Sequence, residues 1–452
     1  MIEEFMNHNL FWKDLELFKR QDPHLSFLKG LKFVHPLDWW REIDWSQPGI
    51  YLLTGGRQLG KTTSTKLLID DSLKASRFFP QNIFYLPCDQ LESHLDLGRM
   101  IRLFLEQISG PFLIIVDEVT YVREWDRAIK ALADEGQFRR GFCIVTGSDS
   151  IILKEAMSRF PGRRGEAEKT DFHLTPLDFR EYLELTDPPL LASGNAEKLF
   201  EPFDAYLQCG GYLRAINNLH QQGTVSPATF ATFEQWIRGD FEKRGKSSEQ
   251  LCQILKALLE TLGSQVTFST LAQRIGEISK PTVIDYCQML ERLDILFDLQ
   301  AYDQNKRIGF PRKARKFHFW DPFILETVSR WLRRDLHLKQ EIDLTSVKVE
   351  SVTASTFKRR FPTFYHKGKG EIDVVTLVYK KPVCLEVKWT GQIRSWDLEE
   401  LQKKKPSFIL TKISSPGILS GVQAIPLPLF LINFEKFIGP AMDSREFADN
   451  PR

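Results

Sequence analysis

The residues with the clearest chemical potential form a glycine-rich loop at positions 55–63. The segment fits the pattern Gly-x-x-x-x-Gly-Lys-[Ser/Thr], follows an apolar run at 49–54 and precedes a helix-like stretch. Its glycines let the backbone curl so that N–H groups face a phosphate, and a helix N-terminus adds positive charge there. Lys61 is predicted to contact the β- and γ-phosphates, and Thr62 to bind Mg²⁺. The predicted nucleotide-binding residues of this loop are Gly55, Gly56, Arg57, Gln58, Leu59, Gly60, Lys61, Thr62 and Thr63.

Two carboxylates, Asp117 and Glu118, follow a second apolar run at 112–116. In a parallel sheet, side chains at the carboxyl ends of strands face the crevice where ligands bind. Asp117 is therefore predicted to hold Mg²⁺ through water, and Glu118 to polarise the water that attacks the γ-phosphate. An ordinary acidic loop is the simpler alternative, and it is less favoured because a phosphate loop lies upstream.

A third apolar run ends in Thr146, Gly147 and Ser148. Thr146 is predicted to contact the γ-phosphate or the attacking water, with Ser148 as the alternative for the same role. Thr-Gly-Ser is also a common turn, so the weight of this prediction comes from its place in the series of strand ends.

A separate set of charged residues lies near the C-terminus, at Asp373, Glu386 and Lys388. Alternate residues of a strand share a face, so Glu386 and Lys388 would point into one site while Val387 points to the core. The carboxylates offer the hard oxygen atoms that Mg²⁺ prefers, and Lys388 would assist hydroxide formation or stabilise charge on a scissile phosphate. An amphipathic hairpin with charges on its exposed face is the alternative, because Glu-x-Lys is frequent in ordinary strands.

A sheet is needed to position these residues, and the apolar pattern predicts one. Short, almost wholly apolar runs alternate with longer mixed segments, which indicates a parallel sheet covered by helices on both faces. The predicted strands lie at 49–54, 82–86, 111–116 and 142–146. Helical periodicity replaces the strands downstream of this region, and strands return near 372–375 and 383–387.

The segment 269–286 has the pattern of a helix, a turn and a second helix, with Gly276 ending the first and Pro281 in the first turn of the second. A short strand and a basic, turn-rich stretch follow, which predicts a winged helix whose second helix reads the major groove and whose wing contacts phosphates. The wing cations are Lys306, Arg307, Arg312, Lys313, Arg315 and Lys316. Because the exposed positions of the second helix are not basic, a protein-interaction module is an equal alternative.

The order of these motifs resembles a prokaryotic, archaeal-type family of AAA+-like P-loop ATPases. The resemblance rests on Gly-Arg-Gln-x-Gly-Lys-Thr-Thr, Val-Asp-Glu-Val-x-Tyr-Val-x-x-Trp-Asp, Val-Thr-Gly-Ser and Pro-Gly-Arg-Arg-Gly, and it covers most of the chain. It implies an α/β fold in which a P-loop NTPase (AAA+-like) parallel sheet with a helical lid is followed by a winged helix. An α/β restriction-endonuclease-like domain of the PD-(D/E)XK class would complete the chain.

The resemblance also implies roles for further residues. Arg163 matches a position that serves as a sensor or arginine finger, with Arg164 as the alternative, and the finger could act in its own chain or in a neighbouring copy. A solvated basic loop is an equal alternative for both arginines. Glu350 matches an extra acidic position, so the implied metal ligands of the nuclease-like domain are Glu350, Asp373 and Glu386.

Six parts are predicted along the chain. They are a helical N-terminal lead-in at 1–47, an AAA+-like P-loop ATPase core at 48–172, a helical lid at 173–248, a winged helix at 249–330, a nuclease-like domain at 331–440 and a loose tail at 441–452.

Composition narrows the class of protein. The 61 Lys and Arg residues face 59 Asp and Glu residues, so no general basic excess favours nucleic acid. Six widely spaced cysteines, no signal-peptide pattern at the N-terminus and no long apolar segment predict a cytoplasmic protein without a membrane span.

Two functions fit these features. In the first, ATP hydrolysis with Mg²⁺ controls a metal-dependent nuclease-like, DNA-binding domain. In the second, the protein is a nucleotide-operated regulatory switch whose C-terminal domain binds nucleic acid or a partner without cleaving. ATP is the predicted ligand, DNA the predicted partner, and the AAA+ resemblance suggests a homo-oligomer.

Overall fold

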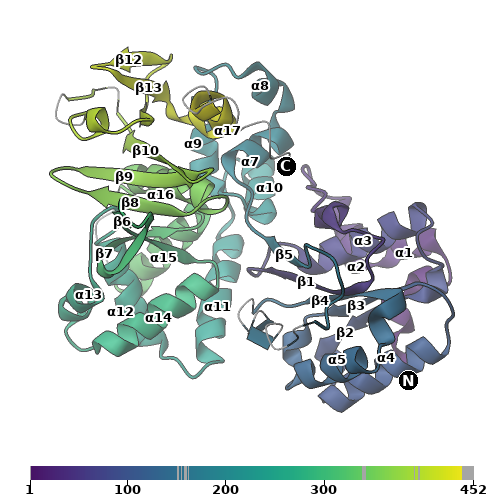
Figure 1. Cartoon of the computed structure of the whole chain (residues 1–452). Helices are drawn as coiled ribbons and strands as arrows, with labels where there is room; N and C mark the ends of the chain where they lie inside the picture. The colour runs from purple at the N-terminus through teal and green to yellow at the C-terminus, as the bar shows by residue number, and fades with distance from the viewer. Residues whose placement is uncertain are drawn as a thin grey trace. The chain divides into compact units, whose positions relative to one another are not determined.

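The chain forms two compact units, Met1–Thr175 and Pro176–Arg452. Figure 1 shows the helices and strands of each unit. The computed structural model describes residues 2–149, 152–153, 155–156, 160, 162–337, 343–390, 392–394 and 398–439. The loose tail predicted at 441–452 therefore lies outside the described residues. In the part of the chain described, no helix combines the length and the apolar character needed to cross a membrane.

A five-stranded parallel sheet forms the centre of the first unit, in the order β2-β3-β4-β1-β5. Its strands are β1 (Gly49–Gly55), β2 (Ile83–Pro87), β3 (Phe112–Asp117), β4 (Gly141–Thr146) and β5 (Asp171–Leu174). The predicted parallel sheet is confirmed. Every residue of β1 to β4 is buried, whereas β5 buries only Phe172 and so lacks the apolar run that marks the other strands.

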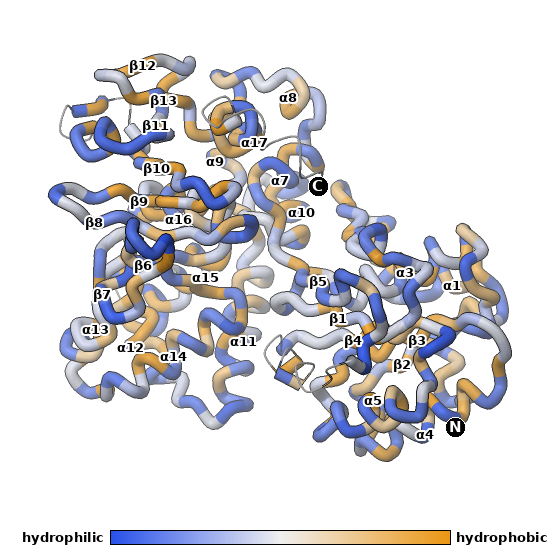
Figure 2. Tube along the Cα trace, in the orientation of Figure 1, coloured by the Kyte–Doolittle hydropathy of each residue, from blue (hydrophilic) through white to orange (hydrophobic). Residues whose placement is uncertain are grey.

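Helices cover both faces of this sheet. The helices of the first unit are α1 (Leu15–Gln21), α2 (Pro23–Leu28), α3 (Lys61–Lys74), α4 (His94–Glu106) and α5 (Trp125–Asp134), and the 3₁₀ turns are η1 (Ile2–His8), η2 (Leu10–Trp12), η3 (Trp39–Glu42), η4 (Pro80–Asn82), η5 (Cys88–Gln90), η6 (Val119–Tyr121) and η7 (Gln137–Arg140). Ile50 and Leu52 pack in the core with α4 and α5, and the alternate residues Tyr51 and Leu53 pack with α1 and α3. Figure 2 shows the apolar residues of these strands in orange.

The N-terminal segment covers the outer edge of the sheet, which is formed by β2. Asn9 accepts a hydrogen bond from the Tyr85 amide and donates one to the Tyr85 carbonyl, and the Trp12 indole donates to the Ile83 carbonyl. An edge strand otherwise presents unpaired backbone groups to solvent, so these contacts attach the first residues of the chain firmly to the sheet.

The second unit contains an eight-stranded mixed sheet in the order β12-β13-β11-β10-β9-β8-β6-β7. Its strands are β6 (Leu296–Asp303), β7 (Ile308–Phe319), β8 (Thr363–Lys367), β9 (Glu371–Val378), β10 (Lys381–Lys388), β11 (Ser407–Thr411), β12 (Gly417–Leu419) and β13 (Val422–Pro426). Its helices are α7 (Phe179–Thr186), α8 (Pro188–Ser193), α9 (Phe200–Cys209), α10 (Leu213–Gln222), α11 (Pro227–Glu242), α12 (Ser248–Leu259), α13 (Phe268–Ile275), α14 (Lys280–Arg292), α15 (Pro322–Asp335), α16 (Thr345–Lys358) and α17 (Leu427–Ile438), with the 3₁₀ turn η9 (Leu401–Lys403).

Three helices and a hairpin, α12 to α14 followed by β6 and β7, occupy the region predicted as a winged helix. The hairpin joins β8 through the parallel pair Ala301 and Tyr365, so one sheet crosses the boundary predicted at residue 330. Most of the predicted wing cations lie in strand β7. The prediction that Lys316 contacts phosphates is wrong, because its side chain is 1% exposed.

Candidate active site

The phosphate loop connects β1 to α3 and encloses the Lys61 ammonium. Gly55, Gln58 and Gly60 have positive φ angles of 141°, 63° and 83°. A Cβ atom on Gly55 would lie 2.5 Å from the Leu174 carbonyl oxygen, so a side chain there would collide with β5. Lys61 Nζ donates to the carbonyls of Gly55 at 2.8 Å and Gly56 at 2.9 Å. The loop therefore already curls around a positive charge at the N-terminus of α3.

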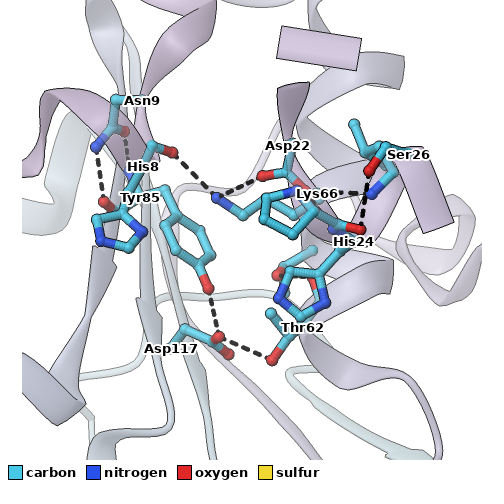
Figure 3. A network of polar contacts seen from close by, with 12 residues as sticks. His8, Asn9, Asp22, His24, Ser26, Thr62, Lys66, Tyr85 and Asp117 are labelled. Atoms are coloured by element: carbon cyan, nitrogen blue, oxygen red, sulfur yellow. Dashed lines mark hydrogen bonds and ion pairs between the residues drawn. The ribbon is translucent and has the colours of Figure 1, made fainter. Parts of the chain in front are cut away.

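Asp117 is the centre of the hydrogen-bond network next to this loop, and it is 4% exposed. Its Oδ2 accepts from Thr62 Oγ1 at 2.9 Å and from the Tyr85 hydroxyl at 2.5 Å (Figure 3). Its Oδ1 accepts from Thr146 Oγ1 at 2.5 Å. Three different elements thus hold one carboxylate in place.

Glu118 follows in a left-handed conformation, with φ at 52°. Its amide donates to Thr146 Oγ1 at 3.0 Å, and its Oε1 accepts from the Ser148 amide at 2.8 Å and from the hydroxyls of Ser148 and Thr120. These bonds set the direction of the carboxylate. Thr146 itself is fully buried, and its hydroxyl bridges Asp117 to the Glu118 amide.

The residues of this site fit Mg²⁺ and a nucleoside triphosphate. The Thr62 hydroxyl and the Asp117 carboxylate provide the hard oxygen atoms that Mg²⁺ prefers, 2.9 Å apart. Both residues and Glu118 line a cavity of about 610 Å³. The loop backbone and Lys61 would hold the phosphates at its edge.

Four residues outside the sequence motifs, His8, Asp22, Lys66 and Tyr85, extend this network (Figure 3). Lys66 is 2% exposed. Its ammonium donates to the His8 carbonyl at 3.0 Å, lies 3.4 Å from Asp22 Oδ2 and sits 3.2 Å from the centre of the Tyr85 ring. Burial lowers the pKa of Lys66 to about 8, and burial followed by the charge of Asp117 raises the pKa of Tyr85 well above its usual value.

The structure does not bring Arg163 together with the phosphate loop of its own chain. Arg163 pairs with Asp134 at the end of α5, and the neighbouring Arg164 carbonyl accepts from the Ile50 amide at the start of β1. Gly55 lies at the opposite end of that strand, and five strand residues span about 17 Å.

The C-terminal candidates do come together. Glu350 comes from α16, Asp373 from β9, and Glu386 and Lys388 from β10. The Asp373 amide donates to Glu386 Oε2 at 3.3 Å, and Lys388 Nζ lies 2.9 Å from Glu386 Oε1. Burial, followed by the charge of Asp373, raises the pKa of Glu386 to about 8 and that of Glu350 to about 7.

Lys316, one of the predicted wing cations, enters this cluster from β7. Its Nζ lies 2.9 Å from Glu350, 2.6 Å from Glu371 and 2.8 Å from Asp373. Burial opposes the charge on Asp373, but Lys316 outweighs it and lowers the pKa of that carboxyl. Within the described ranges, no three His, Cys, Asp or Glu side chains are arranged to hold a metal ion. The set predicted for Mg²⁺, Glu350, Asp373 and Glu386, therefore does not fit a divalent ion in this arrangement.

Two segments of the chain match models of protein families. Residues 47–183 match the family model of an AAA domain, and residues 200–335 match a model of a domain of unknown function. An uncharacterised protein of Methanocaldococcus jannaschii is 26% identical over 399 residues, which cover 79% of each chain.

Two solved structures are distantly similar. The Walker-type ATPase of Pyrococcus abyssi has a TM-score of 0.42 at 14% identity, covering 70% of this chain and 97% of that one. The ORC2 protein of Aeropyrum pernix, in ADPNP–ADP complexes, has a TM-score of 0.38 at 14% identity, covering 64% and 89%. The AAA-domain match spans the phosphate loop, β3 and β4, so the first unit contains a P-loop ATPase-like AAA domain.

Proposed function

We propose that this protein binds and hydrolyses ATP in its first unit and that the nucleotide cycle controls a nuclease-like, DNA-binding domain in its second unit. The observation that carries the first half is the Asp117 carboxylate, bonded to Thr62 beside the phosphate loop and followed by Glu118. The six cysteines are all buried free thiols, which agrees with a reducing compartment such as the cytoplasm.

Each residue of the site has a proposed role. The loop amides and Lys61 bind the phosphates, and Mg²⁺ bound near Thr62 and Asp117 would neutralise their charge. Glu118 orients the attacking water and accepts its proton. Thr146 positions both acids, because its hydroxyl bonds to Asp117 and to the Glu118 amide.

The expected result for Glu118→Gln is tight ATP binding with hydrolysis slowed by about 100-fold or more, because the amide cannot take a proton. Lys61→Ala should weaken ATP binding by about tenfold or more, because the phosphates lose a charge-assisted donor. ATP binding and phosphate release, measured with and without DNA, check both. Glu124→Gln and Lys74→Ala change the same charges at exposed positions and should behave as wild type. Normal turnover by Glu118→Gln would contradict the assignment of the base.

For the second unit we propose the parts predicted above: a helical lid in α7 to α11, a winged helix in α12 to β7, and a restriction-endonuclease-like domain around Asp373, Glu386 and Lys388. The contact of Glu386 with both Asp373 and Lys388 supports a nuclease-like centre. Lys316 favours the second candidate function, a nucleotide-operated switch that binds nucleic acid without cleaving, because its ammonium stands among the acids. Cleavage of DNA by wild type with Mg²⁺ and ATP, lost in Lys388→Ala, would instead support a nuclease.

We also propose that Arg163 acts on a neighbouring copy in a homo-oligomer. Its position near the start of β1, away from its own phosphate loop, supports a role between copies.

A further inference from the structure

One buried lysine lies at the centre of the acidic cluster in the second unit. Lys316 Nζ contacts carboxylates from two elements, Glu350 on α16 and both Glu371 and Asp373 on β9, at 2.6 to 2.9 Å. The side chain is 1% exposed. Buried charges need partners of opposite sign, and here one ammonium serves three carboxylates.

A second buried group faces the same cluster. His318 lies two residues beyond Lys316 on the same face of β7, and it is completely buried. Its Nε2 lies 3.9 Å from Glu350 Oε1 and has no hydrogen-bond partner among the described residues, while its Nδ1 is 3.3 Å from the Ser351 hydroxyl. A buried imidazole nitrogen without a partner is costly, and imidazole is a common metal ligand.

We propose that Lys316 occupies the cation position of this centre in place of a divalent metal, and that its removal uncovers a metal site made by the three carboxylates it contacts, Glu350, Glu371 and Asp373, with His318 beside Glu350. Metal–oxygen bonds of about 2.0–2.6 Å would put a divalent ion in direct contact with Nζ, and two cations cannot share that position. The wild-type centre therefore excludes metal and does not use it for hydrolysis. The inference rests on the proposed nuclease-like centre and not on the proposed ATPase.

Lys316 is a fixed part of the sheet. It pairs with Leu299 of β6, and His318 pairs with Phe297, on which its ring stacks at 5.4 Å. The neighbouring Arg315 forms a bridge with Val266 and an ion pair with Asp298 at 2.7 Å. The backbone that carries Lys316 is therefore held in the same sheet as β9 and β10.

The test uses the full chain without nucleotide and Mn²⁺ alone as the probe. Titration calorimetry compares wild type, Lys316→Met, and each of these combined with Asp373→Asn, so that binding at other sites is subtracted. Lys316→Met is expected to gain about tenfold or more in Mn²⁺ affinity, and Asp373→Asn should abolish the gain. Lys313→Met removes the same charge from an exposed position of the same strand and should bind Mn²⁺ as wild type does.

Thermal unfolding provides an independent readout. Lys316→Met should melt at a lower temperature than wild type in EDTA, because its carboxylates lose their counter-ion, and Mn²⁺ should restore the melting temperature. Mn²⁺ binding by wild type that Asp373→Asn removes would overturn the inference and leave the nuclease-like centre standing. A folded Lys316→Met that gains no Mn²⁺ affinity, or whose melting temperature Mn²⁺ does not restore, would overturn both the inference and the nuclease-like centre. Lys61 belongs to the proposed ATPase site, so a loss of ATPase activity in Lys61→Ala bears neither on the inference nor on the nuclease-like centre.

Discussion

Asp117 receives hydrogen bonds from Thr62, Tyr85 and Thr146, and each donor comes from a different strand or helix. The sequence motifs predict Thr62, Thr146 and Asp117 as residues of the site. They do not predict Tyr85, although its hydroxyl makes one of the shortest contacts to the carboxylate. A charged acceptor strengthens each of these bonds, so the carboxylate is held in place before a ligand arrives.

Tyr85→Phe removes one of these donors. The free energy of unfolding should fall by about 1–2 kcal/mol, and the Mg²⁺ concentration for half-maximal ATPase rate should rise, because Asp117 loses one of its supports. Denaturant unfolding and Mg²⁺ titration of the ATPase rate measure the two effects. Tyr51→Phe is the control, since its hydroxyl bonds to the Gln47 carbonyl. It should cost about 1 kcal/mol or less and leave the Mg²⁺ dependence unchanged.

The buried Lys66 makes the stability of the first unit depend on pH. Burial lowers its pKa in the folded protein to about 8, against 10.5 as the ordinary value, while Asp22 and Asp117 partly offset the effect. Between these values the unfolded chain binds more protons than the folded one, so the free energy of unfolding rises with pH.

We expect wild type to gain about 2 kcal/mol relative to Lys66→Met between about pH 8 and pH 10. Urea unfolding of both proteins without nucleotide measures this difference. The variant removes the titrating group, so the tyrosines and other lysines contribute almost equally to both proteins. A difference that is constant over this range would show that the pKa of Lys66 is not lowered.

At the scale of elements, the turn between α9 and α10 uses two glycines to join distant parts of the second unit. Gly210 has φ at 58°, and the following Gly211 amide donates to Asp321 at 2.8 Å. Asp321 also caps α15 by accepting from the Phe323 amide. The turn therefore packs directly against the start of a helix about a hundred residues away in the chain.

Gly210→Ala should be strongly destabilising. Its Cβ would lie 1.9 Å from Asp321 Oδ1, and its φ angle already disfavours a side chain. A loss of about 3 kcal/mol or more in the free energy of unfolding is expected. Gly223→Ala is the matched control, because it also has a positive φ but meets no atom within 4 Å. It should lose only about 1–2 kcal/mol, and equal losses would contradict the steric explanation.

For the molecule as a whole, the role proposed for Arg163 would link ATP hydrolysis to assembly. In the structure it lies near the start of β1, paired with Asp134, while its own phosphate loop is at the end of that strand. An arginine that completes the site of a neighbouring copy would make ATP hydrolysis depend on protein concentration.

Mixing Arg163→Ala with Glu118→Gln should therefore restore ATPase activity above that of either variant alone. At some interfaces between the two variants, the intact Glu118 of the Arg163→Ala chain would meet the intact Arg163 of the Glu118→Gln chain. Steady-state phosphate release at several mixing ratios measures the recovery. Arg139→Ala, at an exposed position of η7, should hydrolyse ATP as wild type and serves as the control. Activities that merely add in the mixture would mean that Arg163 does not act between copies.

The sequence by itself determined the parts of the molecule that depend on local spacing. The phosphate loop is recognisable because a short run of consecutive residues builds the whole cradle, and four strands are recognisable because a parallel sheet buries both faces of each strand. The strand β5 was missed because it buries one residue in four.

Only the tertiary structure decided which charged residues meet. Lys66 lies one helical turn after Thr62, a spacing that could have directed attention to it, but its partners His8 and Asp22 precede it by more than forty residues. Lys316 belongs to a basic run that predicts a wing in contact with phosphates. Its burial depends on α16 and β9, which come later in the chain. The charge of a residue is known from its type in the sequence. Its partner and its exposure depend on contacts between distant segments, which a local sequence pattern does not predict.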